Sequence, residues 1–549
     1  MTLLTLLNAP TLAAYTAAGF WGDETIYRLA ARHARTMPEA FAVRDRHRRL
    51  SYAELVAAAD RLAAYLTGLG MRPGHRVAVW LPSRVETAVA LLACSRNAYV
   101  CCPSLHRDHR VGEVVALVDR MRAAALIAAP GYGADAGRHD IFAELAERDF
   151  LRCAWRVGAA DAAPFAELPE PAIDTEPSRD PNQIVYLPFT SGTTGEPKGV
   201  LHSDNTLLAT ARTMARDWRL EHTVLYTLSP LSHNLGLGAL ITALAGGGEL
   251  VLHDLPRGAS LLDRLEETQA EFLFGVPTHA IDLLAEARAR GVSRIGMVRG
   301  FRISGAATPP QLITELMRHG VTPPSGYGMT ETCSHQYTLP DDPPERIAET
   351  CGRACAGYEI RIWRQDDLDT EAPPGETGEI GGRGASLMLG YFDDQKATEA
   401  SFNAQGWFMT GDLGWLDEAG YLHVTGRKKE VIIRGGRNIH PAKMEALVLR
   451  HRAIEKAAAF PVADARLGER VCLAVVTRGG EEVDAEAILE HLDAAGLPRY
   501  DMPEYLVMLA EMPLTASGKF LKRELVRRVA EGELQPLPVR LRPRSAISG

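Results

Sequence analysis

Apolar positions in the first two thirds of the chain alternate between short runs and longer periodic segments. Short apolar runs typical of strands buried on both faces occur at 76–81, 223–228, 249–252, 271–274 and 300–304. The spacing of apolar positions predicts helices over 52–69, 85–98, 206–218, 237–245, 261–269, 278–290 and 310–319. Strands that alternate with helices of this length favour right-handed crossovers and a parallel sheet, in which ligands bind beyond the carboxyl ends of the strands.

The pattern changes at about residue 351, where short apolar runs are separated by many glycines. These runs predict a small β subdomain, and the charged segment Gly426–Glu430 then lies between two predicted strands. We therefore expect an α/β protein with a large N-terminal domain of doubly wound sheets and a small, mobile α+β C-terminal domain. The expected boundaries are 1–426, with the β subdomain at about 351–426, then 427–533, and a loose tail at 534–549.

Length and composition exclude several classes of protein. The 549 residues exceed what one core usually holds, and the net charge of −9 comes without the basic stripe of a nucleic-acid partner. Eight cysteines are too few for a disulfide framework, and reduced thiols favour a cytoplasmic location. The apolar N-terminus lacks a basic leading segment and is interrupted at Asn8 and Pro10, so we expect no signal peptide. We also expect no transmembrane segment, because no apolar run reaches about 18 residues.

One stretch, Thr190–Gly199, combines glycines, hydroxyls and a lysine between a predicted strand and a predicted helix. Its glycines allow a tight turn, and its freed N–H groups form a concave anion site with Thr190, Ser191, Gly192, Thr193, Thr194, Gly195 and Lys198. The sequence therefore predicts a phosphate-binding loop that differs from the common G-x-x-x-x-G-K-[ST] motif. The alternative is a surface turn rich in glycine and threonine.

Five further segments carry candidate chemistry: Gly326–Glu331, Thr410–Gly414, Gly426–Glu430, Gly435–Pro441 and Pro513–Lys519. The carboxylate of Glu331 suits Mg²⁺, and that of Asp412 suits the two hydroxyls of a ribose. Lys519 could neutralise charge on a phosphate. The plainer alternatives are a first-turn charge for Glu331, a turn cap for Asp412 and a surface position for Lys519.

In this order, the segments resemble the motifs of the adenylate-forming superfamily, which contains acyl-CoA synthetases, peptide-synthetase adenylation domains and beetle luciferases. The resemblance covers about residues 25 to 530. It implies that Tyr327 lies against adenine, Thr330 contacts a phosphate and Glu331 helps to hold Mg²⁺. It also implies that Asp412 contacts the ribose, that Arg427 contacts the ribose or a phosphate, and that Lys429 is the hinge. The ATP-binding set implied in this way is Thr190, Ser191, Gly192, Thr193, Thr194, Gly195, Lys198, Gly305, Ala306, Tyr327, Gly328, Thr330, Asp412 and Arg427.

The same resemblance assigns catalysis and the acyl and thiol sites. Lys519, Glu331 and His233 are the implied catalytic residues, with His233, Asn234, Gly236, Ser304, Gly305 and Gly328 at the acyl group. Gly435, Gly436 and Arg437 would line the coenzyme A tunnel, although Lys443 departs from the residues usual there. The pair His233–Asn234 has an alternative, which is that it caps the next helix.

The resemblance implies an acid–CoA ligase that uses ATP, Mg²⁺ and coenzyme A and passes through an acyl-adenylate. Residues 190–208 and 229–238 are most similar to ligases for cyclohexanecarboxylate, benzoate-type or medium-chain acids. Two alternatives stay open: an enzyme that loads the acyl group onto the phosphopantetheine of a carrier protein, and a sensor without turnover. The oligomeric state is open between a monomer and a homodimer.

Overall fold

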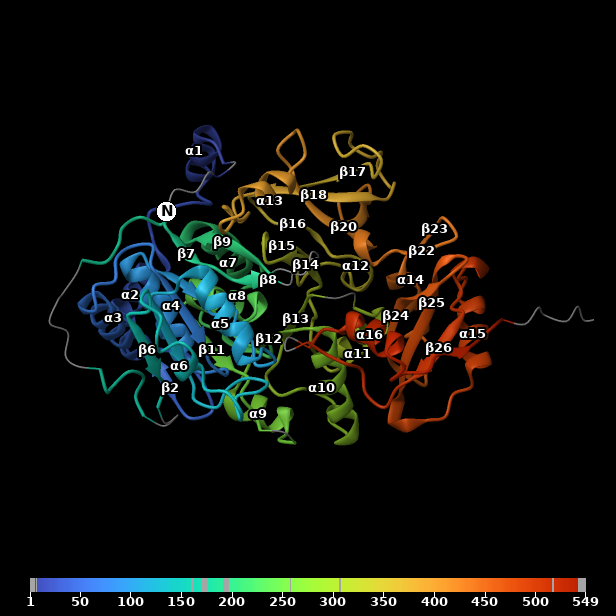
Figure 1. The fold of residues 1–549 in the computed structure, drawn as a ribbon, viewed down its shortest axis with the longest axis horizontal. Coiled ribbons are helices and arrows are strands. Elements are labelled where there is room, and N and C mark those ends of the chain that lie inside the picture. Colours follow the sequence, from blue (N-terminus) through green and yellow to red (C-terminus); the bar gives the residue numbers. More distant parts are fainter. Residues whose placement is uncertain are drawn as a thin grey trace, which may run out of the picture.

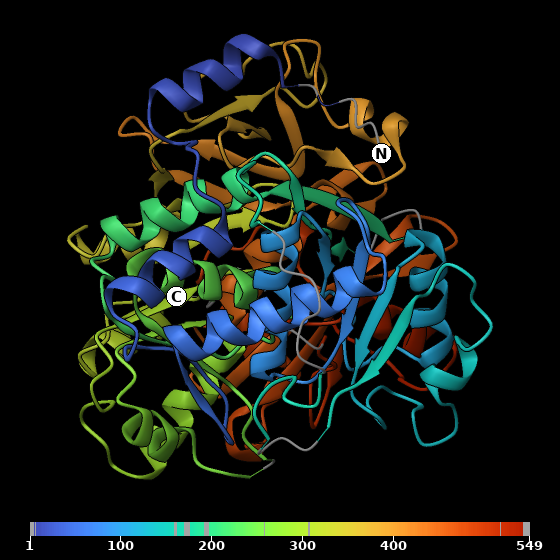
Figure 2. The same cartoon turned by 90° about the vertical axis from the view of Figure 1, so that its left-hand side faces the viewer.

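The two large sheets of the N-terminal part lie on either side of a shared layer of helices (Figures 1 and 2). The computed structural model describes residues 5, 7–158, 162–168, 176–190, 197–256, 258–305, 308–515 and 518–541. In one sheet the order is β13 (Gly300–Ile303), β12 (Phe272–Gly275), β10 (Val224–Thr227), β11 (Glu249–Leu252), β1 (Phe41–Arg44) and β2 (Arg49–Ser51). All neighbours in it are parallel except β1 and β2, which confirms the predicted parallel sheet.

The other large sheet is mixed. Its order is β6 (Cys153–Arg156), β5 (Ala125–Ala128), β3 (Arg76–Trp80), β4 (Val100–Cys102), β7 (Ile184–Tyr186), β9 (Lys198–Ser203) and β19 (Gly390–Tyr391). The strands from β6 to β7 are parallel, whereas β9 runs antiparallel to both β7 and β19. A short strand, β8 (Phe189–Thr190), also pairs with β9.

The stretch predicted as the phosphate loop follows β7 and precedes α7 (Asp204–Asp217), as expected, but strand β9 lies between it and the helix. The loop joins β8 to β9, with Thr190 opposite Lys198 in the antiparallel register. Helix α7 begins two residues before the expected start at Thr206 because Ser203 caps it by accepting a hydrogen bond from the Thr206 N–H at 3.2 Å.

Helices cover both faces of each large sheet. The shared layer contains α2 (Ile26–Thr36), α3 (Tyr52–Gly68), α4 (Val85–Asn97), α7 and α8 (Asn234–Gly246). The outer faces are covered by α5 (Val111–Met121) and α6 (Ile141–Glu144) on one sheet and by α9 (Leu261–Thr268), α10 (Pro277–Ala289), α11 (Pro310–Arg318) and α12 (Pro344–Glu349) on the other. The fold class predicted from the pattern is confirmed.

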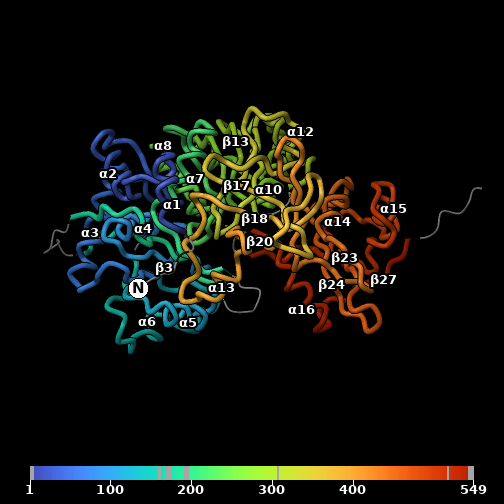
Figure 3. The backbone as a smooth tube through the Cα atoms, turned by 90° about the horizontal axis from the view of Figure 1, so that it is seen from above, coloured from blue at the N-terminus to red at the C-terminus, as the bar shows by residue number. Residues whose placement is uncertain are grey.

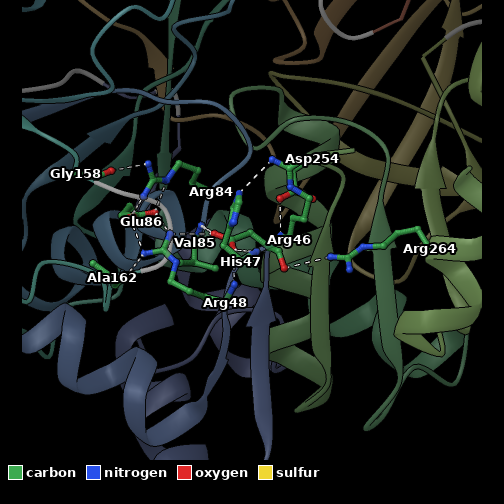
Figure 4. Close-up of polar contacts among 11 residues, drawn as sticks. Arg46, His47, Arg48, Arg84, Val85, Glu86, Gly158, Ala162, Asp254 and Arg264 are labelled. Carbon is green, nitrogen blue, oxygen red and sulfur yellow. Dashed lines mark hydrogen bonds and ion pairs between the residues drawn. The ribbon is translucent and has the colours of Figure 1, made fainter. Parts of the chain in front are cut away.

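A buried ion cluster joins the two sheets at the β1–β2 turn (Figure 4). Arg48 contacts Glu86 at 2.7 Å and Asp45 at 3.0 Å, and the exposed fractions of the two acidic residues are 2% and 1%. From helix α9, which covers the sheet that contains β1 and β2, Arg264 Nη2 donates to the backbone oxygen of Asp45 at 3.2 Å. Each charge in the cluster has an opposite charge or a hydrogen-bond partner, as buried charges require.

Two smaller antiparallel sheets follow. One has the order β14 (Gly326–Met329), β15 (Cys333–Tyr337) and β16 (Arg353–Ala354). The other contains β17 (Tyr358–Trp363), β18 (Gly378–Gly384), β20 (Phe408–Leu416) and β21 (Leu422–Arg427). Two more helices, α1 (Ala9–Ala17) and α13 (Gln395–Ala400), lie near the second sheet (Figure 1).

The C-terminal part forms its own sheet at one end of the molecule (Figure 3). A 3₁₀ turn, η1 (Lys428–Glu430), leads from β21 into β22 (Ile432–Arg434), β23 (Arg437–Ile439), β24 (Ile454–Asp464), β25 (Gly468–Thr477), β26 (Tyr505–Met508) and β27 (Leu537–Pro538). The helices α14 (Pro441–Val448), α15 (Ala485–Ala494) and α16 (Lys522–Ala530), with the 3₁₀ turns η2 (Arg478–Gly480) and η3 (Arg499–Asp501), complete this part.

The expectation of a loose tail from residue 534 is corrected in part. Strand β27 pairs with β26, and the Val539 N–H donates to the Glu504 oxygen at 2.9 Å. Val539 and Leu541 also pack against the core of the C-terminal sheet, which fixes this portion of the tail. None of the described helices combines the length and the apolar character that a membrane span requires.

Candidate active site

A buried carboxylate, Asp412, is held between two strands and a tyrosine. Asp412 lies in β20 directly opposite Arg427 in β21, and Arg427 Nε approaches its Oδ1 at 3.0 Å. The Tyr327 hydroxyl donates to Oδ2 at 2.7 Å. Burial raises the pKa of Asp412, and the charge of Arg427 opposes that shift. Since both oxygens have a donor, the carboxylate has one orientation.

The residues that meet here lie on strands. Gly326–Met329 forms strand β14, and Asp412 lies within strand β20 rather than capping a turn, which was the plainer alternative. Gly328 permits close pairing, since a Cβ there would lie 2.1 Å from the Cys333 oxygen. Tyr327 and Asp412 therefore meet because two different sheets abut, which no local pattern indicates.

A second buried carboxylate, Glu331, follows β14. The Tyr391 hydroxyl donates to Glu331 Oε1 at 3.0 Å, and Lys198 Nζ lies 4.5 Å from the centre of the Tyr391 ring. Burial raises the pKa of Glu331, whereas the charges of Lys198 and Arg427 oppose that rise. A carboxylate can share a divalent cation with phosphate oxygens, which are hard ligands of the same kind. Within the described ranges no group of three or more His, Cys, Asp or Glu could hold a metal by itself, so such a cation would need ligand oxygens.

Lys519 reaches the same site from the C-terminal part. Its side chain crosses Gly305, where a Cβ would lie 2.7 Å from Lys519 Cε, and Gly305 has a positive φ of 90°. Burial and the charge of Arg427 together lower the pKa of Lys519 to about 8, and the charge of Asp412 opposes this shift. Lys519 is thus brought together with Gly305, Arg427 and Asp412, which are far apart in the sequence.

His233 lies at the start of α8, within electrostatic range of Lys519. Its Nδ1 accepts a hydrogen bond from the Leu235 N–H at 3.2 Å, so His233 caps the helix as the alternative interpretation held. Burial lowers the pKa of His233 well below its usual value, and the charges of Lys519, His106 and His279 add to this effect. A neutral imidazole that accepts at Nδ1 carries its proton on Nε2, which is therefore a donor.

A small cavity between α7 and α8 extends from Asn234. It is lined by Leu207, Thr210, Ala211, Met214, Asn234, Gly238, Ile241, Cys333 and Ser334. No atom lies within 4 Å of a Cβ built at Gly238, whereas a Cβ at Gly236 would lie 2.3 Å from the Pro230 oxygen. Gly236, predicted to leave room for the acyl group, is instead required for packing against this backbone, and Gly238 borders the open space.

The remaining predicted residues divide into three groups. Ser191, Gly192, Thr193, Thr194, Gly195 and Ala306 lie outside the described residues. The Thr330 oxygen accepts a hydrogen bond from His202 at 2.8 Å, Thr190 pairs with Lys198, and Ser304 follows β13 directly before Gly305.

Gly435 and Gly436 form the two-residue turn between β22 and β23, and Arg437 stacks over Tyr500 at 4.6 Å, on the C-terminal sheet. Lys429 lies in η1, as expected for a residue between the two parts.

Sequence reasoning missed several residues of this site. Tyr391 lies in a two-residue strand that carries no motif. The α7 side chains that line the cavity were predicted only as part of a helix, not as part of a site. Cys333 and Ser334 could have been found, because they follow Glu331 by two and three residues. The others needed the packing of distant elements.

Known proteins match this chain along nearly its whole length. Residues 30–392 match the family described as AMP-binding enzyme, and residues 443–519 match the AMP-binding enzyme C-terminal domain. The medium-chain fatty-acid–CoA ligase of Escherichia coli is 30% identical over 97% of this chain and 96% of its own length. The indoleacetate–CoA ligase of Aromatoleum aromaticum is 34% identical over 91% and 97%. The crystal structure of ATP-bound MatB from Rhodopseudomonas palustris superposes with a TM-score of 0.79 at 26% identity, covering 92% of this chain and 99% of that one.

Proposed function

This chain belongs to the AMP-binding enzyme family, and we propose that it is an AMP-forming acid–CoA ligase. In the first half-reaction a carboxylate oxygen attacks the α-phosphorus of ATP, the bond to the bridging oxygen breaks, and pyrophosphate leaves. In the second, the coenzyme A thiol attacks the acyl carbon, AMP leaves, and the thiol proton is released. The observation that carries this proposal is that Lys519, whose side chain crosses Gly305, lies within electrostatic range of the Asp412–Arg427 pair.

Each of these groups has a role in the first half-reaction. The fixed carboxylate of Asp412 accepts from the ribose hydroxyls, with Tyr327 beside the adenine and Arg427 beside the ribose or a phosphate. The ammonium of Lys519 neutralises charge that develops on the α-phosphate during attack. No protein nucleophile is required, since positioning and charge neutralisation suffice. A bound Mg²⁺, held by Glu331 and ATP oxygens, would neutralise charge on the departing pyrophosphate.

The second half-reaction requires Lys519 to withdraw so that the thiol can enter. The glycine turn at Gly435–Gly436, with Arg437, is then the part of the C-terminal domain that lines the thiol path. The two glycines have positive φ values of 57° and 82°, a conformation that suits a narrow turn without side chains. This role implies a domain boundary at about residue 426 and a hinge at Lys429.

The acyl group extends from His233 into the cavity between α7 and α8. His233 offers its Nε2 proton near the carboxyl group, and Asn234 lies at the cavity wall. Most of the other lining side chains are apolar or small, and no charged side chain is among them. This uncharged and largely apolar lining favours an apolar acyl group, in line with the medium-chain and aryl acids named for the two relatives.

We place the reaction in the cytoplasm, because all eight cysteines are free thiols and most are buried.

The decisive experiment is acid-dependent exchange of pyrophosphate into ATP across a panel of monocarboxylates, followed by detection of thioester with free coenzyme A. We expect exchange and a saturable coenzyme A response with cyclic, aryl or medium-chain acids. Exchange without thioester would instead indicate transfer to a carrier protein. Absence of exchange with every acid would overturn the proposal.

A further inference from the structure

One face of helix α10 contacts the C-terminal part at two places. Thr278 and Asp282 are four residues apart on this helix, so their side chains lie on one face. Thr278 contacts the loop that carries Lys519, and Asp282 contacts strand β24.

The contact of Thr278 depends on a glycine. The Thr278 hydroxyl donates to the Gly518 oxygen at 2.8 Å, one residue before Lys519, and Thr278 is buried with 4% exposure. Gly518 has a positive φ of 82°, and a Cβ there would lie 3.0 Å from Val276 and 3.1 Å from both His279 and Thr278. A side chain at position 518 would therefore be strained and crowded. Only glycine brings this carbonyl close to the start of α10.

The contact of Asp282 is electrostatic. Lys456 Nζ of β24 lies 3.6 Å from Asp282 Oδ1, and the exposed fractions of the two side chains are 14% and 65%. Glu455 lies at the same distance from Lys456, so the lysine is shared by two carboxylates. An exposed pair of this kind contributes little to stability but can favour one domain orientation.

We propose that this face of α10 is the docking surface that holds the C-terminal domain in the adenylate-forming orientation, with Thr278 as a positioning residue for Lys519. The inference rests on the proposed function, because the proposed function assigns Lys519 to the first half-reaction only. Each contact stabilises the orientation in which Lys519 lies at Gly305. Loss of a contact lowers the population of that orientation, and the rate of adenylate formation falls in proportion.

The first test replaces the hydroxyl of Thr278 by a methyl group of the same size, in Thr278→Val, with Thr278→Ser as the variant that keeps the donor. Adenylate formation is measured in single turnover, and thioester formation is measured separately from supplied acyl-adenylate and coenzyme A. We expect adenylate formation to slow about 3- to 10-fold in Thr278→Val, as for the loss of one hydrogen bond. Thioester formation should be unchanged or faster, and Thr278→Ser should resemble the wild type.

The second test reverses the charges and does not depend on the folding of the first variant. Asp282→Lys should slow adenylate formation about 2- to 5-fold at low salt, and Asp282→Lys combined with Lys456→Asp should restore it. Asp263→Lys is the matched control, because Asp263 is 63% exposed and pairs at 2.6 Å with Arg290 at the end of α10, away from the C-terminal part. The control should leave the ratio of the two half-reaction rates unchanged.

The two proposals fail in different ways. A wild-type protein that forms no adenylate with any acid would overturn the proposed function. An active wild type in which Thr278→Val slows both half-reactions equally, or neither, would overturn the docking role alone. The docking role would also be overturned if the charge reversal at Asp282 had no effect, or if the double reversal did not restore the rate of adenylate formation.

Discussion

Lys519 is a cation whose charge depends on its surroundings. Burial lowers its pKa to about 8, and protonation is needed to neutralise the α-phosphate. The charged form is therefore complete well below pH 8 and is lost as the pH rises through that value. We predict that kcat/KM for adenylate formation falls on the alkaline side with a midpoint near 8, since this parameter reports the free enzyme.

The control for this prediction is Lys519→Arg. A guanidinium keeps its charge throughout this range, so the variant should lose the alkaline decline even though its rate is lower. A decline of the same shape in both proteins would assign the titration to another group.

Lys519→Ala should abolish adenylate formation and largely spare thioester formation from supplied adenylate.

Asp412 permits a second prediction at this scale. Asp412→Asn keeps the shape of the side chain but removes the charge that Arg427 faces and weakens the acceptor for the ribose. Loss of a charged hydrogen bond costs about 1.5 to 3 kcal/mol, so KM for ATP should rise roughly 10- to 100-fold. Titration of the pyrophosphate-exchange rate with ATP measures this, and an unchanged KM would contradict the assignment.

Two glycines near the start of helix α8 have opposite requirements. Gly236 lies against the backbone of Ser229 and Pro230, whereas no atom lies within 4 Å of a Cβ at Gly238. Gly236→Ala should lower the melting temperature, because the clash involves backbone that cannot move away. Gly238→Val should fold normally but select against bulky acids, which kinetics with a series of acids of increasing size would show. Equal stability of the two variants would contradict this assignment of the glycines.

The elements themselves could mostly be predicted from the sequence. The helices and strands for which a range was predicted between residues 52 and 319 begin and end within about three residues of the predicted positions, because each combines a strong apolar period with clear turn residues. No range was predicted for β4, α5, β5, α6 and β6. The strands β8, β9 and β14 were missed because they contain glycine and polar residues and owe their pairing to neighbours. The site was predictable only as motifs in sequence order, since the approach of Tyr327 to Asp412 and of Lys519 to Gly305 arises from packing between sheets and domains.

At the scale of the whole molecule, the proposed mechanism needs two orientations of the C-terminal domain. The connecting turn η1 includes Lys429, and proline there would fix φ and restrict rotation. We predict that Lys429→Pro slows thioester formation selectively, whereas Lys429→Ala, which removes the side chain without fixing φ, slows it much less. Comparison of the two half-reactions measures this, and equal thioester rates in both variants would place the hinge elsewhere.

The pairing of β27 with β26 has a consequence for how this protein is produced and modified. Leu537 and Pro538 cover the outer edge of the C-terminal sheet opposite Tyr505 and Leu506. A chain cut at residue 533 would expose that edge, and open strand edges recruit other chains into aggregates. Affinity tags and fluorescent fusions therefore belong after residue 541, where they leave this edge covered.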